Sequence, residues 1–247
     1  MVNSMEKWVR KIAVVTGASC GIGEKIAEKL VEQGLVVIGM ARRAELIEEK
    51  IEKLQGLPGE LHAMKVDITN DEELIKAFEE IEEKFGAVHV LVNNAGIIPT
   101  STLIDGNITV WRKILDTNFL ALCVATREAI RSMRKHSIDG HIVHINSVTG
   151  HNVPLFPWLS VYPASKFAVT AVTESLRVEL LKAGSKIKVS SISPGFVRTP
   201  AVIGVDMPED AAILEAEDIA DGVIYVLSTP PHVQIHELMI RPVGEDF

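Results

Sequence analysis

The sequence predicts an α/β fold in which helices cover both faces of a single doubly wound, parallel, seven-stranded sheet. Three observations predict it: short apolar runs rich in β-branched residues recur along the 247 residues, amphipathic stretches of helical spacing separate them, and 47% of the residues are hydrophobic. Strands that alternate with helices pair in parallel through right-handed crossovers, which is how a doubly wound sheet is built.

The first strand and the first helix set a pattern that the rest of the chain repeats. Residues 12–16 form an apolar run, and in residues 21–33 the side chains of Ile22, Ile26 and Leu30 fall near helical spacing. The other expected strands are 35–40, 61–66, 88–92, 141–146, 187–192 and 234–240. The other expected helices are 43–54, 71–85, 109–135, 164–181 and 216–227. The helix at 71–85 begins with an acidic turn, which suits the helix dipole, and Cys123 in 109–135 is expected to be a buried packing residue.

No linker or internal repeat divides the chain, so a single domain over 1–247 is expected, with a cofactor half at about 8–140 and a catalytic half at about 141–247. Two segments, 148–161 and 201–215, follow strands and lack a clear period. Ligands bind at the carboxyl ends of parallel strands, so both segments are candidate walls of a substrate pocket. Their apolar residues fit a pocket, a subunit contact or local core equally well; they are Val153, Leu155, Phe156, Trp158, Val202, Ile203 and Met207.

Charge and cysteine content narrow the class of protein. A net charge of −8 disfavours nucleic acid or an anionic membrane surface as the main partner. Two cysteines, Cys20 and Cys123, are too few for a disulfide framework. The sequence has no signal-peptide pattern at its start and no apolar run of about 18 residues, so a cytoplasmic protein without a membrane span is expected.

A glycine-rich turn follows the first strand, in residues 16–23, and opens the first helix. Free amides at a helix N-terminus and glycines without Cβ atoms can receive a pyrophosphate; a tight turn with no ligand is the alternative. Residues 17–21 also read Gly-x-Ser-x-Gly, the nucleophile elbow of serine hydrolases. That motif needs an oxyanion amide from a loop after an earlier strand, and no earlier strand is predicted, so the hydrolase reading is disfavoured.

Two arginines end the second strand. The acidic residue that would bind the ribose of NAD is expected about 20 residues past the glycines, and the sequence has Arg42 and Arg43 there. A guanidinium suits a ribose 2′-phosphate, so NADP (NADPH) is favoured over NAD. The alternative is that both are solvated charges at the start of the second helix.

Tyr162 and Lys166 are four residues apart, which places them about one turn apart on one helix face. An ammonium near the phenol favours phenolate, so Lys166 is expected to lower the pKa of Tyr162 for acid–base catalysis. A lone pair of this kind is more often an ordinary exposed Tyr and Lys. Here Ser147, at the end of the strand at 141–146, adds a hydroxyl that can donate to a carbonyl oxygen.

Five motifs in chain order make the sequence resemble the short-chain dehydrogenase/reductase family over essentially its whole length. They are TGxxxGxG at 16–23, NNAG at 93–96, the serine at Ser147, YxxxK at Tyr162 and Lys166, and PG at 194–195. The resemblance implies a Rossmann-type fold, hydride transfer with a nicotinamide cofactor, and a homodimer or homotetramer. It adds Asn118 as a fourth catalytic residue, whose side chain or backbone holds a water in a proton relay; the alternative is an ordinary polar residue within a helix. It also lets Lys166 hold the nicotinamide ribose.

The resemblance also implies the binding residues. For the cofactor these are Gly17, Ser19, Cys20, Gly21, Ile22, Gly23, Arg42, Arg43, Asp67, Ile68, Asn94, Ala95, Gly96, Tyr162, Lys166, Pro194, Gly195, Val197 and Thr199. Asp67 and Ile68 would contact adenine; by sequence alone they fit a strand-end turn as well. Cys20 stands where NADP-binding members often have a basic residue, which leaves the 2′-phosphate to Arg42 and Arg43.

Within the family, Arg42 and the stretches 145–151 and 223–230 resemble the NADP-dependent farnesol dehydrogenase branch of insects, which is similar to the vertebrate member-11 enzymes acting on keto and hydroxy steroids. The expected substrate is an apolar alcohol or ketone, a farnesol-type terpenoid first, with steroids or small carbonyl compounds as alternatives. The expected substrate residues are Ser147, Thr149, His151, Trp158 and Tyr162.

Two other functional classes are disfavoured. His141 and His144 lie three residues apart on a strand and point to opposite faces, and His232 and His236 lack further ligands, so no metal is expected. A cofactor-sensing module without turnover would need no catalytic residues, whereas this sequence has the complete set.

Overall fold

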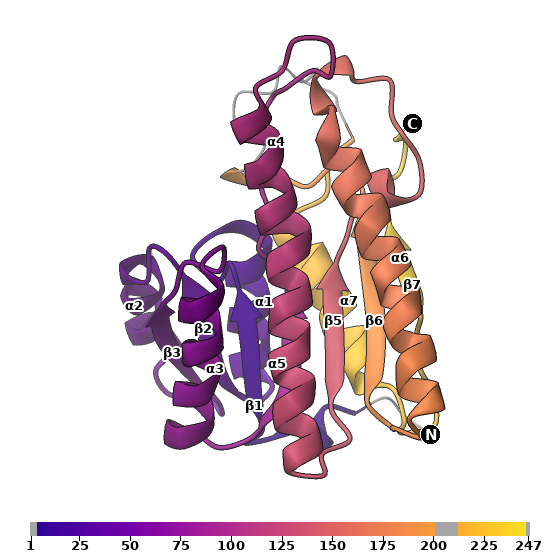
Figure 1. Cartoon of the computed structure of the whole chain (residues 1–247). Helices are drawn as coiled ribbons and strands as arrows, with labels where there is room; N and C mark the ends of the chain where they lie inside the picture. Colours follow the sequence, from indigo (N-terminus) through magenta and orange to yellow (C-terminus); the bar gives the residue numbers. More distant parts are fainter. Residues whose placement is uncertain (1–3, 201–211, 246–247) are drawn as a thin grey trace.

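The computed structural model describes residues 4–200 and 212–245 of the chain. Its seven parallel strands form one sheet in the order β3-β2-β1-β4-β5-β6-β7, which confirms the predicted fold class (Figure 1). The strands are β1 Ile12–Thr16, β2 Val36–Ala41, β3 Glu60–Lys65, β4 Val88–Asn93, β5 His141–Ile145, β6 Lys188–Pro194 and β7 Glu237–Ile240.

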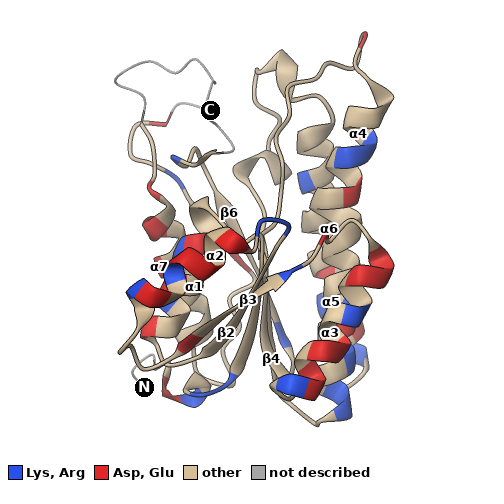
Figure 2. Ribbon diagram, turned by 90° about the vertical axis from the view of Figure 1, so that its left-hand side faces the viewer, with Lys and Arg blue, Asp and Glu red and all other residues tan. Residues whose placement is uncertain are grey.

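Helices lie on both faces of the sheet, with α1, α2 and α7 on one side and α3, α5 and α6 on the other (Figure 2). Their bounds are α1 Gly21–Glu32, α2 Glu45–Ile51, α3 Asp71–Lys84, α4 Ile108–Leu115, α5 Ala121–Lys135, α6 Val161–Lys182 and α7 Ala216–Ser228. Short 3₁₀ turns are η1 Glu6–Trp8, η2 Glu52–Leu54, η4 Val148–Gly150 and η5 Pro157–Leu159. None of the helices described is long and apolar enough to cross a membrane.

The inner strands β1, β2, β4, β5 and β6 are buried almost throughout, whereas the edge strands β3 and β7 are partly exposed. Alternate side chains of the inner strands enter separate cores. In β1, Ala13 and Val15 belong to the core beneath α1 and α7, whereas Ile12 and Val14 belong to the core beneath α3 and α5. Because side chains alternate along a strand, an uninterrupted apolar run is what two covered faces require. The two cores hold the sheet rigid, so the loops at its carboxyl edge have a fixed base.

One predicted helix is divided. Residues 109–135 were expected to be continuous, but a π-helical segment, η3 Asp116–Leu120, separates α4 from α5. Sequence periodicity did not indicate it, because a π segment shifts the helical register by a single residue. Cys123, expected to be a buried packing residue, is only half-buried and lies beside a groove between α5 and α6.

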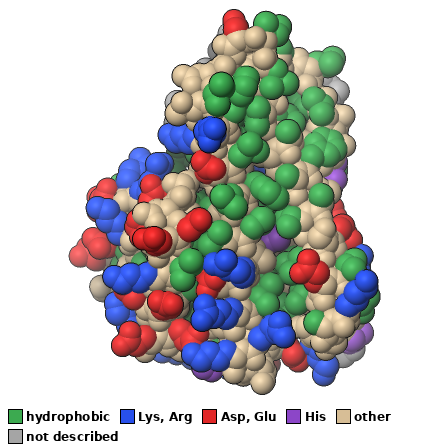
Figure 3. Space-filling model, viewed as in Figure 1, with side chains coloured by type: hydrophobic (Ala, Val, Ile, Leu, Met, Phe, Trp, Pro, Cys, Tyr) green, Lys and Arg blue, Asp and Glu red, His purple; other side chains and the backbone are tan. Residues whose placement is uncertain are grey.

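That groove has a volume of about 560 Å³ and includes Leu122, Ile130 and Leu176 in its lining. Hydrophobic side chains gather along this side of the molecule over α4, α5 and α6, while charged side chains crowd around α3 (Figure 3).

Candidate active site

A cavity of about 730 Å³ lies at the carboxyl edge of the sheet, at the ends of β1, β2, β4, β5 and β6. Most of the residues predicted from the sequence line it together. From the expected cofactor set these are Gly17, Ser19, Cys20, Gly21, Ile22, Arg42, Arg43, Asp67, Ile68, Asn94, Ala95, Gly96, Pro194, Gly195, Val197 and Thr199. From the expected catalytic and substrate sets these are Ser147, Thr149, Trp158, Tyr162 and Lys166. Gly23, Asn118 and His151 do not line it.

The glycine-rich turn is held against β4. Gly17 and Gly21 have φ of +70° and +62°, a left-handed conformation that favours glycine. The Nδ2 of Asn94 donates to the carbonyl oxygens of Thr16 at 2.9 Å and Gly17 at 3.2 Å. A Cβ on Gly23 would lie 2.3 Å from that Nδ2, so Gly23 serves packing behind the turn rather than the cavity wall.

The turn has the features that receive an anion. Helix α1 begins at Gly21, and the side chain of Cys20 makes no capping hydrogen bond to the first turn. Helix N-terminal amides with no side-chain cap attract negative charge. Thr199, which also lines the cavity, lies beside the turn: a Cβ on Gly21 would be 3.3 Å from its side chain. These residues fit the pyrophosphate of a dinucleotide cofactor.

Cationic side chains line the cavity next to the turn, after β2. Arg42 and Arg43 face it, and a guanidinium nitrogen of Arg43 lies 3.8 Å from the Sγ of Cys20. Burial raises the pKa of Asp67, but hydrogen bonds from Thr69 and the charges of Arg42 and Lys113 outweigh it, so the pKa is lowered overall. Lys113, on α4, also lines the cavity. It was missed because the only sequence signal was its place in a helix.

Ser147 and Tyr162, the predicted catalytic serine and tyrosine, both line the cavity and are joined by a side-chain hydrogen bond. Ser147 precedes the turn η4, and its Oγ accepts from the backbone N–H of Thr149 at 3.1 Å and from its Oγ1 at 2.9 Å. Tyr162 lies in the first turn of α6 and is buried. Burial raises the pKa of Tyr162 to about 12, although hydrogen bonds with Ser147 and Thr149 partly oppose the rise. At neutral pH its hydroxyl is therefore protonated.

Lys166 lies one turn after Tyr162, with its Nζ 5.9 Å from the ring centroid. The Nζ donates to the carbonyl oxygen of Ile145 at 2.9 Å, and burial lowers the pKa of Lys166 to about 8. Burial is the largest influence on the pKa of Tyr162, and the hydrogen bonds with Ser147 and Thr149 oppose it. That Lys166 lowers this pKa stays a prediction. The ammonium is thus held by the end of β5 and lies over the ring of Tyr162.

Asn118 lies in the π-helical segment, buried beside the cavity. Its Oδ1 accepts from the backbone N–H of Ile97 at 2.8 Å, and its Nδ2 donates to the carbonyl oxygen of Ile97 at 3.0 Å and to the Oγ of Ser165 at 3.2 Å. The Oγ of Ser165 in turn donates to the carbonyl oxygen of Tyr162 at 2.6 Å. The side chain of Asn118 thus joins the π-helical segment to the loop after β4 and to α6. Because these bonds occupy the side chain, a water in a proton relay would have to bind the backbone of Asn118.

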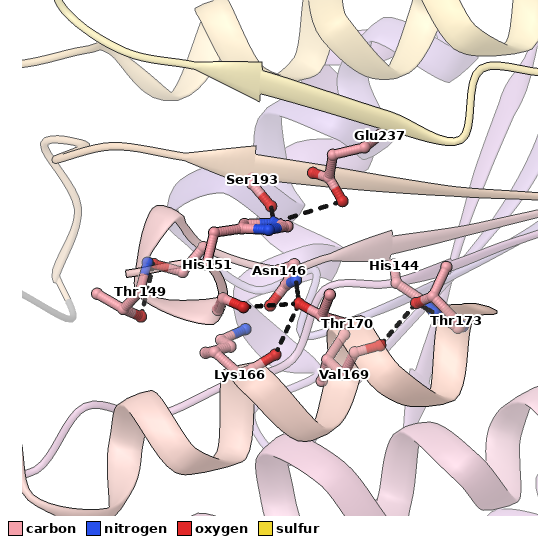
Figure 4. A network of polar contacts seen from close by, with 12 residues as sticks. His144, Asn146, Thr149, His151, Lys166, Val169, Thr170, Thr173, Ser193 and Glu237 are labelled. Carbon is pink, nitrogen blue, oxygen red and sulfur yellow. Dashed lines mark hydrogen bonds and ion pairs between the residues drawn. The ribbon is translucent and has the colours of Figure 1, made fainter. Parts of the chain in front are cut away.

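A second set of contacts joins the serine turn to α6 and was missed by sequence reasoning (Figure 4). The Nδ2 of Asn146 donates to the Oγ1 of Thr170 at 2.8 Å, and this Oγ1 donates to the carbonyl oxygen of Gly150 at 3.0 Å. A Cβ on Gly150 would lie 2.8 Å from the Oδ1 of Asn146. The only available signal was that Thr170 lies one turn after Lys166 on the same helix face.

His151 is the predicted substrate residue that the structure places elsewhere. Its Nε2 lies 3.0 Å from the Oγ of Ser193 and 3.5 Å from a carboxylate oxygen of Glu237, so the ring lies against β6 and β7 (Figure 4). After the turn η4 the backbone directs this side chain toward the sheet edge. Its position one residue beyond a cavity-lining turn could not reveal that direction.

Aromatic side chains form the wall next to Tyr162. Phe156 and Trp158 stack with centroids 5.6 Å apart, and the backbone N–H of Ser101 donates to the carbonyl oxygen of Trp158 at 2.9 Å. The segment after β4 therefore supports this wall, and Ile97 and Ile98 add apolar lining that sequence reasoning did not name. Val153 and Leu155 are exposed. Val202, Ile203 and Met207 lie outside the described residues.

Comparisons with known proteins agree with this geometry. The family model described as short chain dehydrogenase matches residues 11–209. The chain is 51% identical to a farnesol dehydrogenase of Aedes aegypti, over 98% of this chain and 100% of that protein. It is 44% identical to dehydrogenase/reductase SDR family member 11 of Bos taurus, over 98% of this chain and 99% of that protein. Among solved structures it resembles an alcohol dehydrogenase of Thermococcus sibiricus complexed with 5-hydroxy-NADP, with a TM-score of 0.86 and 26% sequence identity. The superposition covers 96% of this chain and 98% of that protein.

Proposed function

This chain belongs to the short-chain dehydrogenase family of oxidoreductases, and on that premise we propose that it is an NADP-dependent alcohol dehydrogenase or carbonyl reductase acting on an apolar substrate. One observation carries the proposal. The protonated hydroxyl of Tyr162, the Oγ of Ser147 and the buried Lys166 face the same cavity as a glycine turn built to receive a pyrophosphate. A binding module without chemistry would need only the turn.

The reaction follows from the protonation states of these side chains. When bound, the nicotinamide supplies or accepts the hydride. In the reducing direction Tyr162 donates its proton to the substrate oxygen, and Ser147 donates a hydrogen bond to that oxygen as charge develops on it. Lys166, with a pKa of about 8, is mostly charged at neutral pH and stabilises the phenolate left behind. In the oxidising direction the same groups act in reverse.

NADP rather than NAD is proposed from the charges next to the glycine turn. Arg42 and Arg43 line the cavity after β2, where the adenosine ribose would lie, and a guanidinium binds a phosphate with two parallel hydrogen bonds. The lowered pKa of Asp67 keeps a negative charge there, which Arg42 and Lys113 offset. An NADP analogue bound to the Thermococcus sibiricus relative supports the proposal.

A farnesol-type terpenoid alcohol is the first proposed substrate. Its support is the identity to a farnesol dehydrogenase, together with the apolar wall of Ile97, Ile98, Phe156 and Trp158. An unbranched polar substrate would leave this wall without partners, because apolar pockets bind through the area they bury. We also propose a homodimer or homotetramer, supported by the apolar groove between α5 and α6.

A substrate panel with purified protein tests the proposal. Farnesol, a hydroxysteroid and a small secondary alcohol are each offered with NADP and with NAD at one pH, and absorbance of the reduced cofactor is followed. Fastest turnover of farnesol with NADP is expected. Cofactor binding without oxidation of any alcohol or reduction of the matching carbonyl compounds would favour a sensor instead.

Tyr162→Phe tests the assigned proton donor. Turnover should fall by a factor of about 10² to 10⁴, the usual contribution of general acid catalysis, while NADPH still binds. The control is Tyr225→Phe, because Tyr225 is the other tyrosine of the chain and is 47% exposed on α7. Near-wild-type activity of Tyr162→Phe would refute the assignment.

A further inference from the structure

A buried carboxylate supports the turn that follows β6. The side chain of Glu245 is 2% exposed, although it lies in an irregular segment after β7. Its Oε1 accepts from the backbone N–H of Phe196 at 3.1 Å, and its Oε2 pairs with the Nε of Arg241. A buried carboxylate is costly unless it is paired, so this contact is an organised part of the fold.

The carboxylate of Glu245 also lies close to the Cα of Gly195, where a side chain would otherwise begin. A Cβ at this position would lie 2.6 Å and 2.9 Å from the two oxygens of Glu245, distances that Cβ atoms essentially never show. Its φ is not left-handed, so a larger residue here would meet the Glu245 carboxylate rather than backbone strain, and the carboxylate would have to move away from the turn. The backbone N–H of Gly195 donates to the carbonyl oxygen of Ile240 at 2.7 Å, which fixes the turn to the end of β7 as well.

The same turn is held on its other side by the chain before α7. The N–H of Leu214 donates to the carbonyl oxygen of Phe196 at 2.8 Å, and the N–H of Arg198 donates to the carbonyl oxygen of Leu214 at 2.8 Å. Together with Ile240 and Leu214, Glu245 therefore supplies one of three supports for a stretch of backbone that lines the cavity from Pro194 to Val197.

This stretch lies at the reacting end of the cavity. It follows β6, the neighbour of β5, whose end carries Ser147, whereas Arg42 and Arg43 follow β2 on the other side of β1 and β4. We propose that Glu245 is a positioning residue that fixes the turn 194–197 for the nicotinamide end of the cofactor, with no part in binding the adenosine end. The inference rests on the proposed function, because it assumes a dinucleotide in this cavity.

Two variants separate the charge of Glu245 from its hydrogen bond. Glu245→Ala removes both contacts, and Glu245→Gln keeps an oxygen for the N–H of Phe196 but loses the ion pair with Arg241. Isothermal titration compares NADPH with 2′,5′-ADP, a fragment that has the adenosine end alone. Glu245→Ala should weaken NADPH about tenfold, equivalent to about 1.4 kcal/mol, and leave 2′,5′-ADP unchanged, with Glu245→Gln in between.

Hydrogen exchange of cofactor-free protein gives a second readout, because the backbone N–H of Phe196 should exchange faster in Glu245→Ala. The control is Glu80→Gln, which removes an exposed i,i+4 pair with Lys84 on α3 and should change neither measurement. Equal weakening of NADPH and 2′,5′-ADP, or unchanged values for both, would overturn the inference. Wild-type protein that binds neither ligand would instead contradict the proposed function, and the exchange of Phe196 would still test the support.

A double-mutant cycle tests the contact with Gly195. Gly195→Ala should weaken NADPH by itself, because its Cβ meets the carboxylate, and the further change Glu245→Ala should recover part of that loss. Two variants whose effects simply add would show that the carboxylate and the turn act independently.

Discussion

Replacing Asn118 tests how the π-helical segment is joined to the catalytic elements. Its side chain is 2% exposed and makes three hydrogen bonds, two with the backbone of Ile97 and one with Ser165. A neutral hydrogen bond contributes about 1 kcal/mol net to stability, so Asn118→Ala should lower the free energy of unfolding by about 3 kcal/mol. An exposed asparagine gives the control: Asn107 caps α4 through one bond to Thr109, and Asn107→Ala should cost about 1 kcal/mol.

Asn118→Asp tests the hydrogen bonds without changing the shape of the side chain. It keeps the bond from the N–H of Ile97 but places an oxygen 3.0 Å from the carbonyl oxygen of Ile97, where Asn118 has a donor. Burial should raise the pKa of the new carboxyl above its unfolded value of about 3.9. The folded state then holds a proton that the unfolded state releases, so this variant should lose stability relative to wild type as the pH rises from about 4 toward neutrality.

Urea unfolding followed by circular dichroism at pH 5 and pH 8 measures both effects, provided the slope with denaturant is unchanged. Asn118→Asp should be less stable than Asn118→Ala at pH 8, and the gap should narrow at pH 5. An Asn118→Ala variant within about 1 kcal/mol of wild type would refute the reasoning, since three buried bonds cannot be lost at so small a cost.

Two further predictions concern the cofactor and acid stability. Arg42→Ala should raise the KM for NADP at least about tenfold, because it removes one charge-assisted hydrogen bond to the 2′-phosphate. The KM for NAD should stay within about threefold of the wild-type value. Steady-state kinetics with both cofactors measure the two constants, and equal effects would contradict a 2′-phosphate role. Burial lowers the pKa of His141 and His144 to about 3, so the unfolded chain binds protons that the folded chain does not as the pH falls below about 6.5. Stability should therefore fall between about pH 6.5 and pH 3, and a flat urea midpoint over that range would show that these rings are not buried and neutral.

Much of the fold followed from local patterns. The uninterrupted apolar run Ile12–Thr16 required two covered faces, and the structure places its alternate side chains in the two cores. The four-residue spacing of Tyr162 and Lys166 placed both at one cavity, because helical geometry alone fixes neighbours at that distance. These predictions succeeded because each depends on residues close together in the chain.

Other features depended on partners that are distant in the sequence. The direction of His151 is set by Ser193 and Glu237, and the support of Gly195 and Phe196 comes from Glu245. The π-helical turn at Asn118 is stabilised by contacts with Ile97 and Ser165, and no periodicity in the helix itself encodes them.

The sequence by itself determined the α/β architecture, the family and the residues that meet at the carboxyl edge of the sheet. Only the tertiary structure decided their protonation and their supports. Burial raises the pKa of Tyr162 to about 12 and lowers the pKa of Lys166 to about 8, and neither change could be read from their spacing in the sequence. The physical reason is that a periodicity fixes which side chains are neighbours, while a pKa depends on how much water and which dipoles the whole fold leaves around a group.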